Sequence, residues 1–215
     1  GFDPKADLMP ITVVSSGPQV VVVNPNLPVK TLKELIELAK AKPGTLNYGH
    51  AGIGSQTHLA AENLLYATGL NIQNIPYKGE GPAITDLVAG QINMATPNVP
   101  AAIGFINGGK LRALAVTGKE RSPALPNVPT VAETVPGFEN IGWFGLMAPA
   151  GTPRAIIDKV YTDVAKVLDT TDMRARFFVQ GMAPTPLTPT AFATRIQNET
   201  ARWATVVRDR KIVGN

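Results

Sequence analysis

Short apolar runs rich in β-branched residues alternate with segments of helical periodicity along most of this 215-residue chain. Residues 11–14 and 19–23 show the first pattern, and residues 15–18 between them have the Ser, Gly and Pro composition of a turn. The alternative is that the two segments together make one long, kinked strand. The following segment begins with Thr31 and Glu34 at capping-box spacing and carries an apolar face. Because strands that alternate with helices typically form parallel sheets covered by those helices, the sequence predicts an α/β fold.

The alternation continues to about residue 139 and then gives way to a mainly helical C-terminal part. A proline-rich stretch at residues 123–136 indicates a loop with at most a short helix around residues 130–134. In the next apolar run, Trp143 and Phe144 are expected in the core. We expect further strands at residues 45–48, 71–77, 92–95, 111–116 and 141–148, and helices at residues 31–42, 55–67, 82–89, 152–169 and 189–211.

A glycine-rich segment at residues 49–57 carries the clearest chemical signal, because it leads from a predicted strand into a predicted helix. Gly52 and Gly54 have no side chain to block a ligand, and Ser55 is placed to cap the helix. Backbone N–H groups and the positive end of the helix dipole would converge there on an anion. A tight turn without a ligand is the alternative. The candidate binding residues are Ala51, Gly52, Gly54, Ser55, Gln56 and Thr57, together with Tyr77 and Asn98 at the ends of other strands.

Other site chemistries fit this sequence poorly. No Lys-Ser or Lys-Thr pair follows the last glycine and the third glycine of a dinucleotide motif is missing, so no phosphate cofactor is predicted. The chain has no cysteine. Its two histidines, His50 and His58, are expected to point in different directions, with no acidic residue near them before Glu62, so no metal site is predicted. A hydrolase that uses Ser55 as its nucleophile lacks the Gly-x-Ser-x-Gly elbow, and we therefore predict no enzyme.

Charge and hydropathy argue against two further classes of partner. The formal net charge is +4. The basic residues are dispersed and form no polybasic run with interleaved aromatic residues, so no nucleic-acid binding is predicted. No apolar run is long enough to cross a bilayer, and we expect no membrane insertion. The sequence as given starts without Met and without a signal peptide.

Several blocks of the sequence, taken in order, resemble those of a known protein family. They are Asn47-Tyr48-Gly49, Gly52-Ile53-Gly54-Ser55, His58-Leu59-Ala60, Ile75-Pro76-Tyr77-Lys78-Gly79, residues 87–93, residues 109–116, residues 129–133 and residues 148–153. The family is that of the Bug or TctC-type extracytoplasmic solute receptors of tripartite tricarboxylate transporters. The resemblance spans nearly the whole chain.

The resemblance implies a type II periplasmic-binding-protein fold, with two lobes of mostly parallel sheets flanked by helices. Residues 25–139 would form a complete lobe 2. Residues 1–24 and 140–215 would form lobe 1 without its N-terminal β-α units. The crossing segments at residues 15–23 and 142–147 would act as the hinge between the lobes.

The resemblance also implies a periplasmic protein that captures a small organic carboxylate at residues 52–57 and delivers it to the membrane subunits of a transporter. It implies neither a cofactor nor catalysis. We expect a monomer, with self-association as a consequence of the incomplete lobe 1. The alternative with the same bilobal plan is the effector-sensing domain of a cytosolic transcription regulator, whose usual helix-turn-helix does not occur in this sequence.

Overall fold

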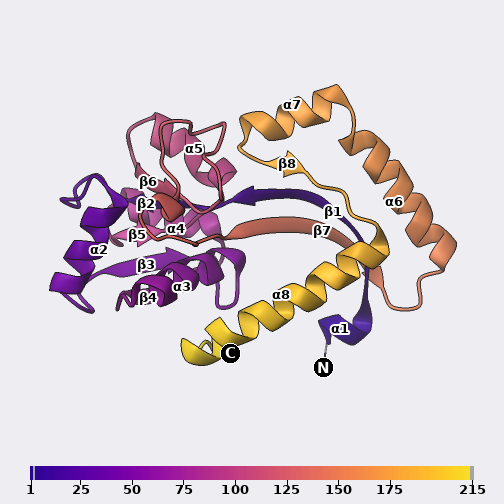
Figure 1. Cartoon of the computed structure of the whole chain (residues 1–215), viewed down its shortest axis with the longest axis horizontal. Helices are drawn as coiled ribbons and strands as arrows, with labels where there is room; N and C mark the ends of the chain where they lie inside the picture. Colours follow the sequence, from indigo (N-terminus) through magenta and orange to yellow (C-terminus); the bar gives the residue numbers. More distant parts are fainter. Residues whose placement is uncertain (2, 214–215) are drawn as a thin grey trace. The chain divides into compact units, whose positions relative to one another are not determined.

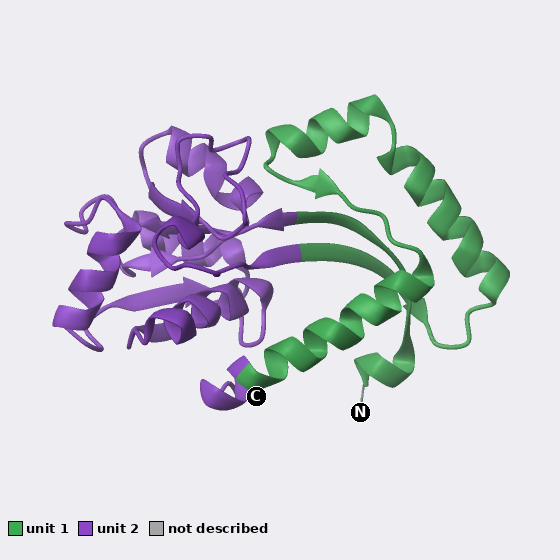
Figure 2. Cartoon of the chain, viewed as in Figure 1, with its two compact units in different colours: residues 1–16, 143–205 green, residues 17–142, 206–215 purple. Residues whose placement is uncertain are grey.

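Two units make up the chain (Figure 2), and the computed structural model describes residues 1 and 3–213. Unit 1 consists of Gly1–Ser16 and Trp143–Thr205, whereas unit 2 consists of Gly17–Gly142 and the residues from Val206 onwards. We expected the first lobe boundary after residue 24. Unit 2 begins earlier than that because residues 20–23 form a strand inside its sheet.

Unit 2 contains a five-stranded sheet of order β4-β3-β5-β2-β6 (Figure 1). The strands are β2 (Val20–Val23), β3 (Asn47–His50), β4 (Gln73–Pro76), β5 (Met94–Ala95) and β6 (Arg112–Val116). β3 runs parallel to β4 and β5, but β2 runs antiparallel to β5 and β6. Because β2 opposes both of its neighbours, β4, β3, β5 and β6 all run in the same direction, and the prediction of mostly parallel strands is confirmed for this sheet. The one exception among these five strands, β2, follows β1 (Leu8–Pro18) after a single residue, so no crossover helix sets its direction.

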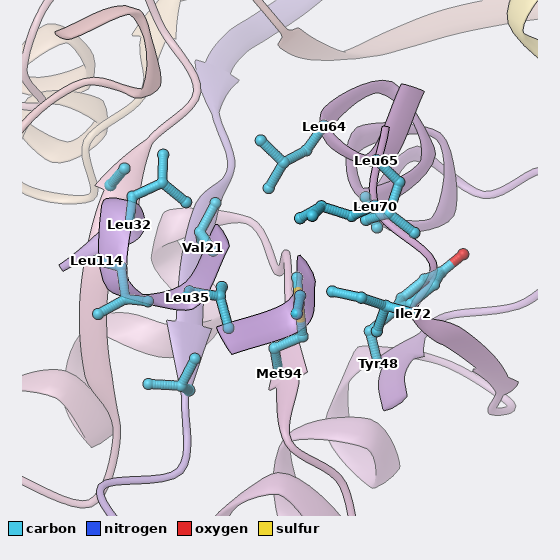
Figure 3. Packing of buried hydrophobic residues seen from close by; sticks show 14 of the residues in the cluster. Val21, Leu32, Leu35, Tyr48, Leu64, Leu65, Leu70, Ile72, Met94 and Leu114 are labelled. Atoms are coloured by element: carbon cyan, nitrogen blue, oxygen red, sulfur yellow. The ribbon is translucent and has the colours of Figure 1, made fainter. Parts of the chain in front are cut away.

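Helices cover both faces of this sheet. The helices α2 (Leu32–Ala41) and α3 (Gln56–Thr68) lie on one face, and α4 (Glu80–Val88) and α5 (Val99–Asn107) lie on the other. Successive residues of a strand point to opposite faces. Val21 and Val23 therefore pack with α3 and with Leu35 of α2 (Figure 3), whereas Val20 and Val22 pack with α4 and α5. All four valines are fully buried, and the predicted α/β class is confirmed.

Local sequence signals account for several helix ends. Thr31 caps α2, as predicted, because its hydroxyl accepts a hydrogen bond from the backbone N–H of Glu34 at 3.2 Å. The short helix expected in the proline-rich loop is confirmed as η1 (Val131–Glu133), which starts with a capping box at Thr130. Helix α5 was not predicted, since Pro100 and Gly104 within it lower the helical propensity of the segment.

Unit 1 holds a three-stranded sheet of order β7-β1-β8, in which β7 is Ile141–Pro149 and β8 is Ala183–Pro184. Its helices are α1 (Pro4–Asp7), α6 (Arg154–Leu168), α7 (Thr171–Val179) and α8 (Pro189–Asp209). The chain passes into unit 2 along β1, β7 and α8. No turn forms at residues 15–18, because Ser15 and Ser16 lie within β1 and pair with Pro184 and Ala183. β1 continues to Pro18 and β2 begins at Val20, so the alternative of one long strand is the one that the structure confirms. Strand β8 has only two residues, too few to produce a periodic signal in the sequence.

The core of unit 1 includes the side chain of Phe192 from α8, which is fully buried. The ring of Trp143 meets it edge-on, with the two ring centroids 5.1 Å apart. Trp143 is half-buried, but the side chain of Phe144 is 49% exposed. The expectation that both residues belong to the core is therefore wrong for Phe144, which lies on an edge strand of its sheet. None of the described helices combines the length and the apolarity needed to span a membrane.

Candidate ligand-binding site

The glycine-rich segment connects β3 to α3, as the sequence predicted. Ser55 is the N-cap of α3, and its hydroxyl accepts a hydrogen bond from the backbone N–H of His58 at 3.3 Å. Gly52 and Gly54 have φ angles of 122° and 75°, a region that residues with a Cβ rarely adopt. The turn itself therefore requires both glycines, whether or not a ligand approaches them.

Two backbone amides of this segment are already paired within unit 2. The N–H of Ala51 donates to the hydroxyl of Thr57 at 2.9 Å, and that of Gly54 donates to Nδ1 of His58 at 3.0 Å. Nδ1 of His50 lies 2.9 Å from the carbonyl oxygen of Gly52 and 3.3 Å from its amide nitrogen, and any one tautomer can bond only one of the two. Neighbouring side chains thus occupy much of the amide cradle that the sequence suggested. Donors for an anion would come instead from hydroxyl groups and from the first turn of α3, since the leading N–H groups of a helix have no partner within it.

The rings of His50 and His58 stack, with their centroids 4.0 Å apart and an interplanar angle of 16°. This corrects the expectation that the two side chains point in different directions. His50 ends β3 and His58 lies in the first turn of α3, so the packing of the helix on the strand brings the rings together. Both side chains are buried, and neither Nε2 atom has a hydrogen-bond partner among the described residues.

Burial favours the neutral form of both histidine rings. Nδ1 of His58 accepts from the N–H of Gly54, so its proton is on Nε2. Burial, together with the adjacent charge that His50 can carry, lowers the pKa of His58 to about 4, although Glu62 opposes the shift. Burial also lowers the pKa of His50, against the hydrogen bond to the carbonyl of Gly52. Recognition of an anion here would therefore rely on dipoles and hydrogen bonds rather than on a histidine cation.

Glu62 lies one turn further along α3, and its side chain is only 5% exposed. The hydroxyl of Tyr48 donates to its Oε1 at 2.5 Å, and Nε of Arg210 donates to its Oε2. These two donors satisfy a carboxylate that would otherwise be costly to bury. Burial and the bond to Glu62 raise the pKa of Tyr48 far above its usual range. Within residues 1 and 3–213, no group of three or more His, Cys, Asp or Glu side chains is placed to hold a metal ion.

A small pocket opens beside the glycine-rich segment and contains about 180 Å³ of empty space, part of it open to solvent. It is lined by Gly49, His50, Ala51, Thr57, Glu80, Ala83, Ile84, Ala95 and Pro97. Pockets that enclose a whole small-molecule ligand typically measure roughly 300–1,000 Å³. The space within unit 2 is therefore too small to enclose a whole ligand.

Glu80 is the one acidic or basic residue among the described residues that line this pocket, apart from the neutral His50. Its Oε2 accepts from the backbone N–H of Asn98 at 3.2 Å, and its Oε1 accepts from the side-chain amide of the same residue. Oδ1 of Asn98 accepts from Nε2 of Gln19 at 3.0 Å, and Oε1 of Gln19 accepts from Thr117 and Asn140. Burial raises the pKa of Glu80, whereas the two hydrogen bonds from Asn98 act in the opposite direction. The side-chain amide of Asn98 was expected to face a ligand. Instead, both its nitrogen and its oxygen are hydrogen-bonded to Glu80 and Gln19.

Two more of the predicted site residues have their polar ends turned to other partners. The carbonyl oxygen of Tyr77 lies 3.7 Å from where a Cβ on Gly52 would be, so its backbone borders the glycine-rich segment. Its hydroxyl, however, donates to Asp86 at 2.8 Å. The side-chain amide of Gln56 lies against Gly142, where a Cβ would be only 2.1 Å from Nε2.

The structure thus brings part of the predicted set together. Ala51 and Thr57 line the pocket, and Gly52, Gly54 and Ser55 form the turn beside it. Sequence reasoning missed Glu80 and Gln19. Glu80 follows Gly79 at the start of α4, and an acidic residue in the first turn of a helix after a strand end is the signal that could have identified it. Gln19 offered no comparable signal, because its partners are far away in the sequence.

Comparison with known proteins identifies the family. The family model for the tripartite tricarboxylate transporter family receptor, TctC, matches residues 1–212. Protein BugT from Bordetella pertussis is 40% identical over 204 residues, which are 94% of this chain and 63% of that protein. A protein from the tcbD-tcbE intergenic region of Pseudomonas sp. (strain P51) is 32% identical over 216 residues, which cover 100% of this chain and 64% of that protein. The chain therefore spans less than two thirds of the length of these curated relatives.

Solved structures agree with this result. R. palustris Rpa4515 with adipate superposes with a TM-score of 0.95 at 35% identity, over 100% of this chain and 72% of that one. The periplasmic binding protein BugD gives a TM-score of 0.91 at 30% identity, over 100% and 73% of the two chains. MatC from Rhodopseudomonas palustris with bound malate gives 0.89 at 31% identity, over 96% and 72%. The periplasmic-binding-protein fold is confirmed, as is the prediction of a receptor-type chain rather than an enzyme, and the chain belongs to the TctC family of tripartite tricarboxylate transporter receptors.

Proposed function

We propose that this chain is the carboxylate-binding part of an extracytoplasmic solute receptor that serves a tripartite tricarboxylate-type transporter. The observation that carries the proposal is the pocket beside the start of α3, in a chain that matches the receptor family over residues 1–212. The similar structures with adipate and malate support a small organic acid as the ligand class. In this proposal the whole protein works in the periplasm and delivers its ligand to membrane subunits.

The carboxylate would point toward the first turn of α3. The helix dipole and the leading amides favour negative charge at that end. Thr57 is one of the residues that line the pocket, and its hydroxyl accepts from the N–H of Ala51. The proton of that hydroxyl can then be donated to a neighbouring oxygen, such as that of Ser55 at 3.2 Å or, in this proposal, that of a ligand.

Isothermal titration calorimetry of this chain with small mono- and dicarboxylates of three to six carbons tests the proposal. Thr57→Val removes the hydroxyl but keeps the side-chain shape, and we expect it to weaken carboxylate binding about tenfold, the value of one lost hydrogen bond. Thr68→Val is the matched control at the other end of α3, where the hydroxyl donates to the carbonyl of Leu64 at 2.6 Å. The proposal fails if no carboxylate binds to the wild type, or if both variants bind as the wild type does.

We also propose that the receptor is a monomer in solution. Multi-angle light scattering at several protein concentrations should give a mass close to the 22.7 kDa of one chain. A mass of twice this value that persists on dilution would contradict the proposal.

A further inference from the structure

Glu62 is a buried carboxylate that lies against three other polar side chains of unit 2. Its Oε1 accepts from the hydroxyl of Tyr48 at 2.5 Å, and its Oε2 accepts from Nε of Arg210. Nε2 of His58, one turn earlier on α3, lies 3.8 Å from the same Oε1. The side chains of His58 and Glu62 are only 4% and 5% exposed, so water screens the carboxylate from the ring very little.

The neutral ring of His58 has one donor nitrogen and one acceptor nitrogen, and the bond to Gly54 shows which is which. Nδ1 accepts from the N–H of Gly54 at 3.0 Å, so the proton is on Nε2, the nitrogen nearer to Glu62. Nε2 has no hydrogen-bond partner, and the carboxylate therefore acts on it through space. A negative charge attracts the Nε2–H group, whereas it would repel the lone pair that Nε2 carries in the other tautomer.

We propose that Glu62 is a positioning residue, whose negative charge selects the Nε2–H tautomer of His58 and thereby keeps the N–H of Gly54 bonded. Gly54 has a φ angle of 75° and immediately precedes Ser55, the N-cap of α3. Its bond to His58 ties the glycine-rich turn to the first turn of the helix. The inference rests on the proposed function, because this turn borders the pocket at which a carboxylate would bind.

The simpler role for Glu62 is to bind Tyr48 and Arg210, and so to hold the residues from Val206 onwards within unit 2. Under either role, a substitution of Glu62 would lower stability. Only the positioning role makes the tautomer of His58 depend on the charge at residue 62. The experiment therefore measures the tautomer, and this measurement needs no ligand.

Two-bond ¹H–¹⁵N correlation spectra at pH 7.5 distinguish a protonated ring nitrogen from a bare one, and the chain has only two histidines. The wild type should show His58 with its proton on Nε2. Glu62→Gln removes the charge, and its amide oxygen would turn to Arg210 and leave the NH₂ group on the side of Nε2. We expect the ratio of the Nδ1–H form to the Nε2–H form to rise about tenfold, and the amide hydrogen of Gly54 to exchange about tenfold faster.

Tyr48→Phe is the matched control, since it removes a hydrogen bond to Glu62 but keeps the charge of the carboxylate. It should leave the tautomer of His58 as in the wild type. The combined replacement Tyr48→Phe, Glu62→Leu and Arg210→Met covers the case in which Glu62→Gln does not fold, because apolar residues in place of a buried ion pair leave no uncompensated charge. It should shift the tautomer in the same direction as Glu62→Gln. The inference is wrong if His58 carries its proton on Nδ1 in the wild type, or if its tautomer is the same in the wild type and in the variants without the Glu62 charge.

Calorimetry with the carboxylates of three to six carbons connects the tautomer to binding. Glu62→Gln should bind about tenfold more weakly any of these acids that the wild type binds, because the turn is no longer held in place. Unchanged affinity despite a shifted tautomer would show that Glu62 does not position the carboxylate site. If none of the acids binds to the wild type, the proposed function is wrong, and the spectra still decide whether Glu62 controls the tautomer of His58.

Discussion

Acid should destabilise unit 2 through His58. The pKa of this histidine falls from 6.5 to about 4 in the folded chain, chiefly because the ring is buried, and further because His50 lies beside it. Above pH 6.5 the ring is neutral in both the folded and the unfolded state, so its contribution is fully present. Below pH 6.5 the unfolded state binds a proton that the folded state does not, and stability is lost until pH reaches about 4.

The size of this loss follows from the two pKa values. Each pH unit between the two pKa values changes the free energy of unfolding by about 1.4 kcal/mol, so the total loss is about 3 kcal/mol. About 2 kcal/mol of it should be lost between pH 7.5 and pH 5, before most carboxylates begin to titrate. The ion-pair distance of 3.8 Å between Nε2 of His58 and Glu62 is too long for a hydrogen bond, and so it does not reverse the sign.

Hydrogen exchange of peptides that cover residues 47–68, followed through a urea titration at pH 7.5 and pH 5, measures this loss within unit 2. The control is His58→Asn, whose Oδ1 can replace Nδ1 as the acceptor for the N–H of Gly54 but cannot take up a proton in this range. The wild type should lose about 2 kcal/mol more than the variant between the two pH values. Equal losses in the two proteins would refute the reasoning, because all other titrating groups are common to both.

Three substitutions in unit 2 give further predictions, each measured as a change in the free energy of unfolding by urea. Tyr48→Phe should cost about 1.5–3 kcal/mol, since it removes the buried donor to the carboxylate of Glu62; a cost below 0.5 kcal/mol would contradict this. Arg210→Met should lower the free energy of unfolding by about 2 kcal/mol, because it leaves that carboxylate without its cation. The cost is limited because the Arg210 side chain is 27% exposed and solvent screens the ion pair. Unchanged stability would show that the ion pair contributes nothing. Gly142→Ala should cost about 1–3 kcal/mol, as its Cβ would lie 2.1 Å from the amide nitrogen of Gln56, and a neutral result would mean that this side chain moves freely.

The sequence predicted those parts of the fold that leave a periodic or capping signal. The continuous run of β-branched residues Val20–Val23 located β2, the segment between the turn at residues 43–44 and the glycine-rich segment located β3, and Thr31 located the start of α2. The strand direction of β2 left no such signal, because antiparallel and parallel strands that are buried on both faces share the same apolar run. The pairing of Ser15 and Ser16 with β8 joins residues that are almost 170 positions apart, as the hydrogen bond between Ser16 and Thr185 shows.

The candidate site likewise contains residues that local sequence patterns predicted and residues that they did not predict. Local patterns identified Gly52, Gly54 and Ser55, because a strand-to-helix turn with positive φ needs glycine and a capping residue. The stacking of His50 on His58 and the placement of Glu80 depend on how α3 and α4 pack on the sheet. Those contacts are tertiary, and spacing along the chain does not encode them.

The paired amides of the glycine-rich segment change how a ligand would be recognised. Gly54 donates to His58 and Ala51 donates to Thr57, so the turn is rigid before any ligand arrives. A site formed in advance loses less conformational entropy on binding than a mobile loop does. The rigidity depends on a neutral His58, because a protonated ring has no acceptor for the N–H of Gly54. The same protonation that lowers the stability of unit 2 therefore also releases the turn, which couples the integrity of the proposed carboxylate site to pH through a residue that does not line the pocket.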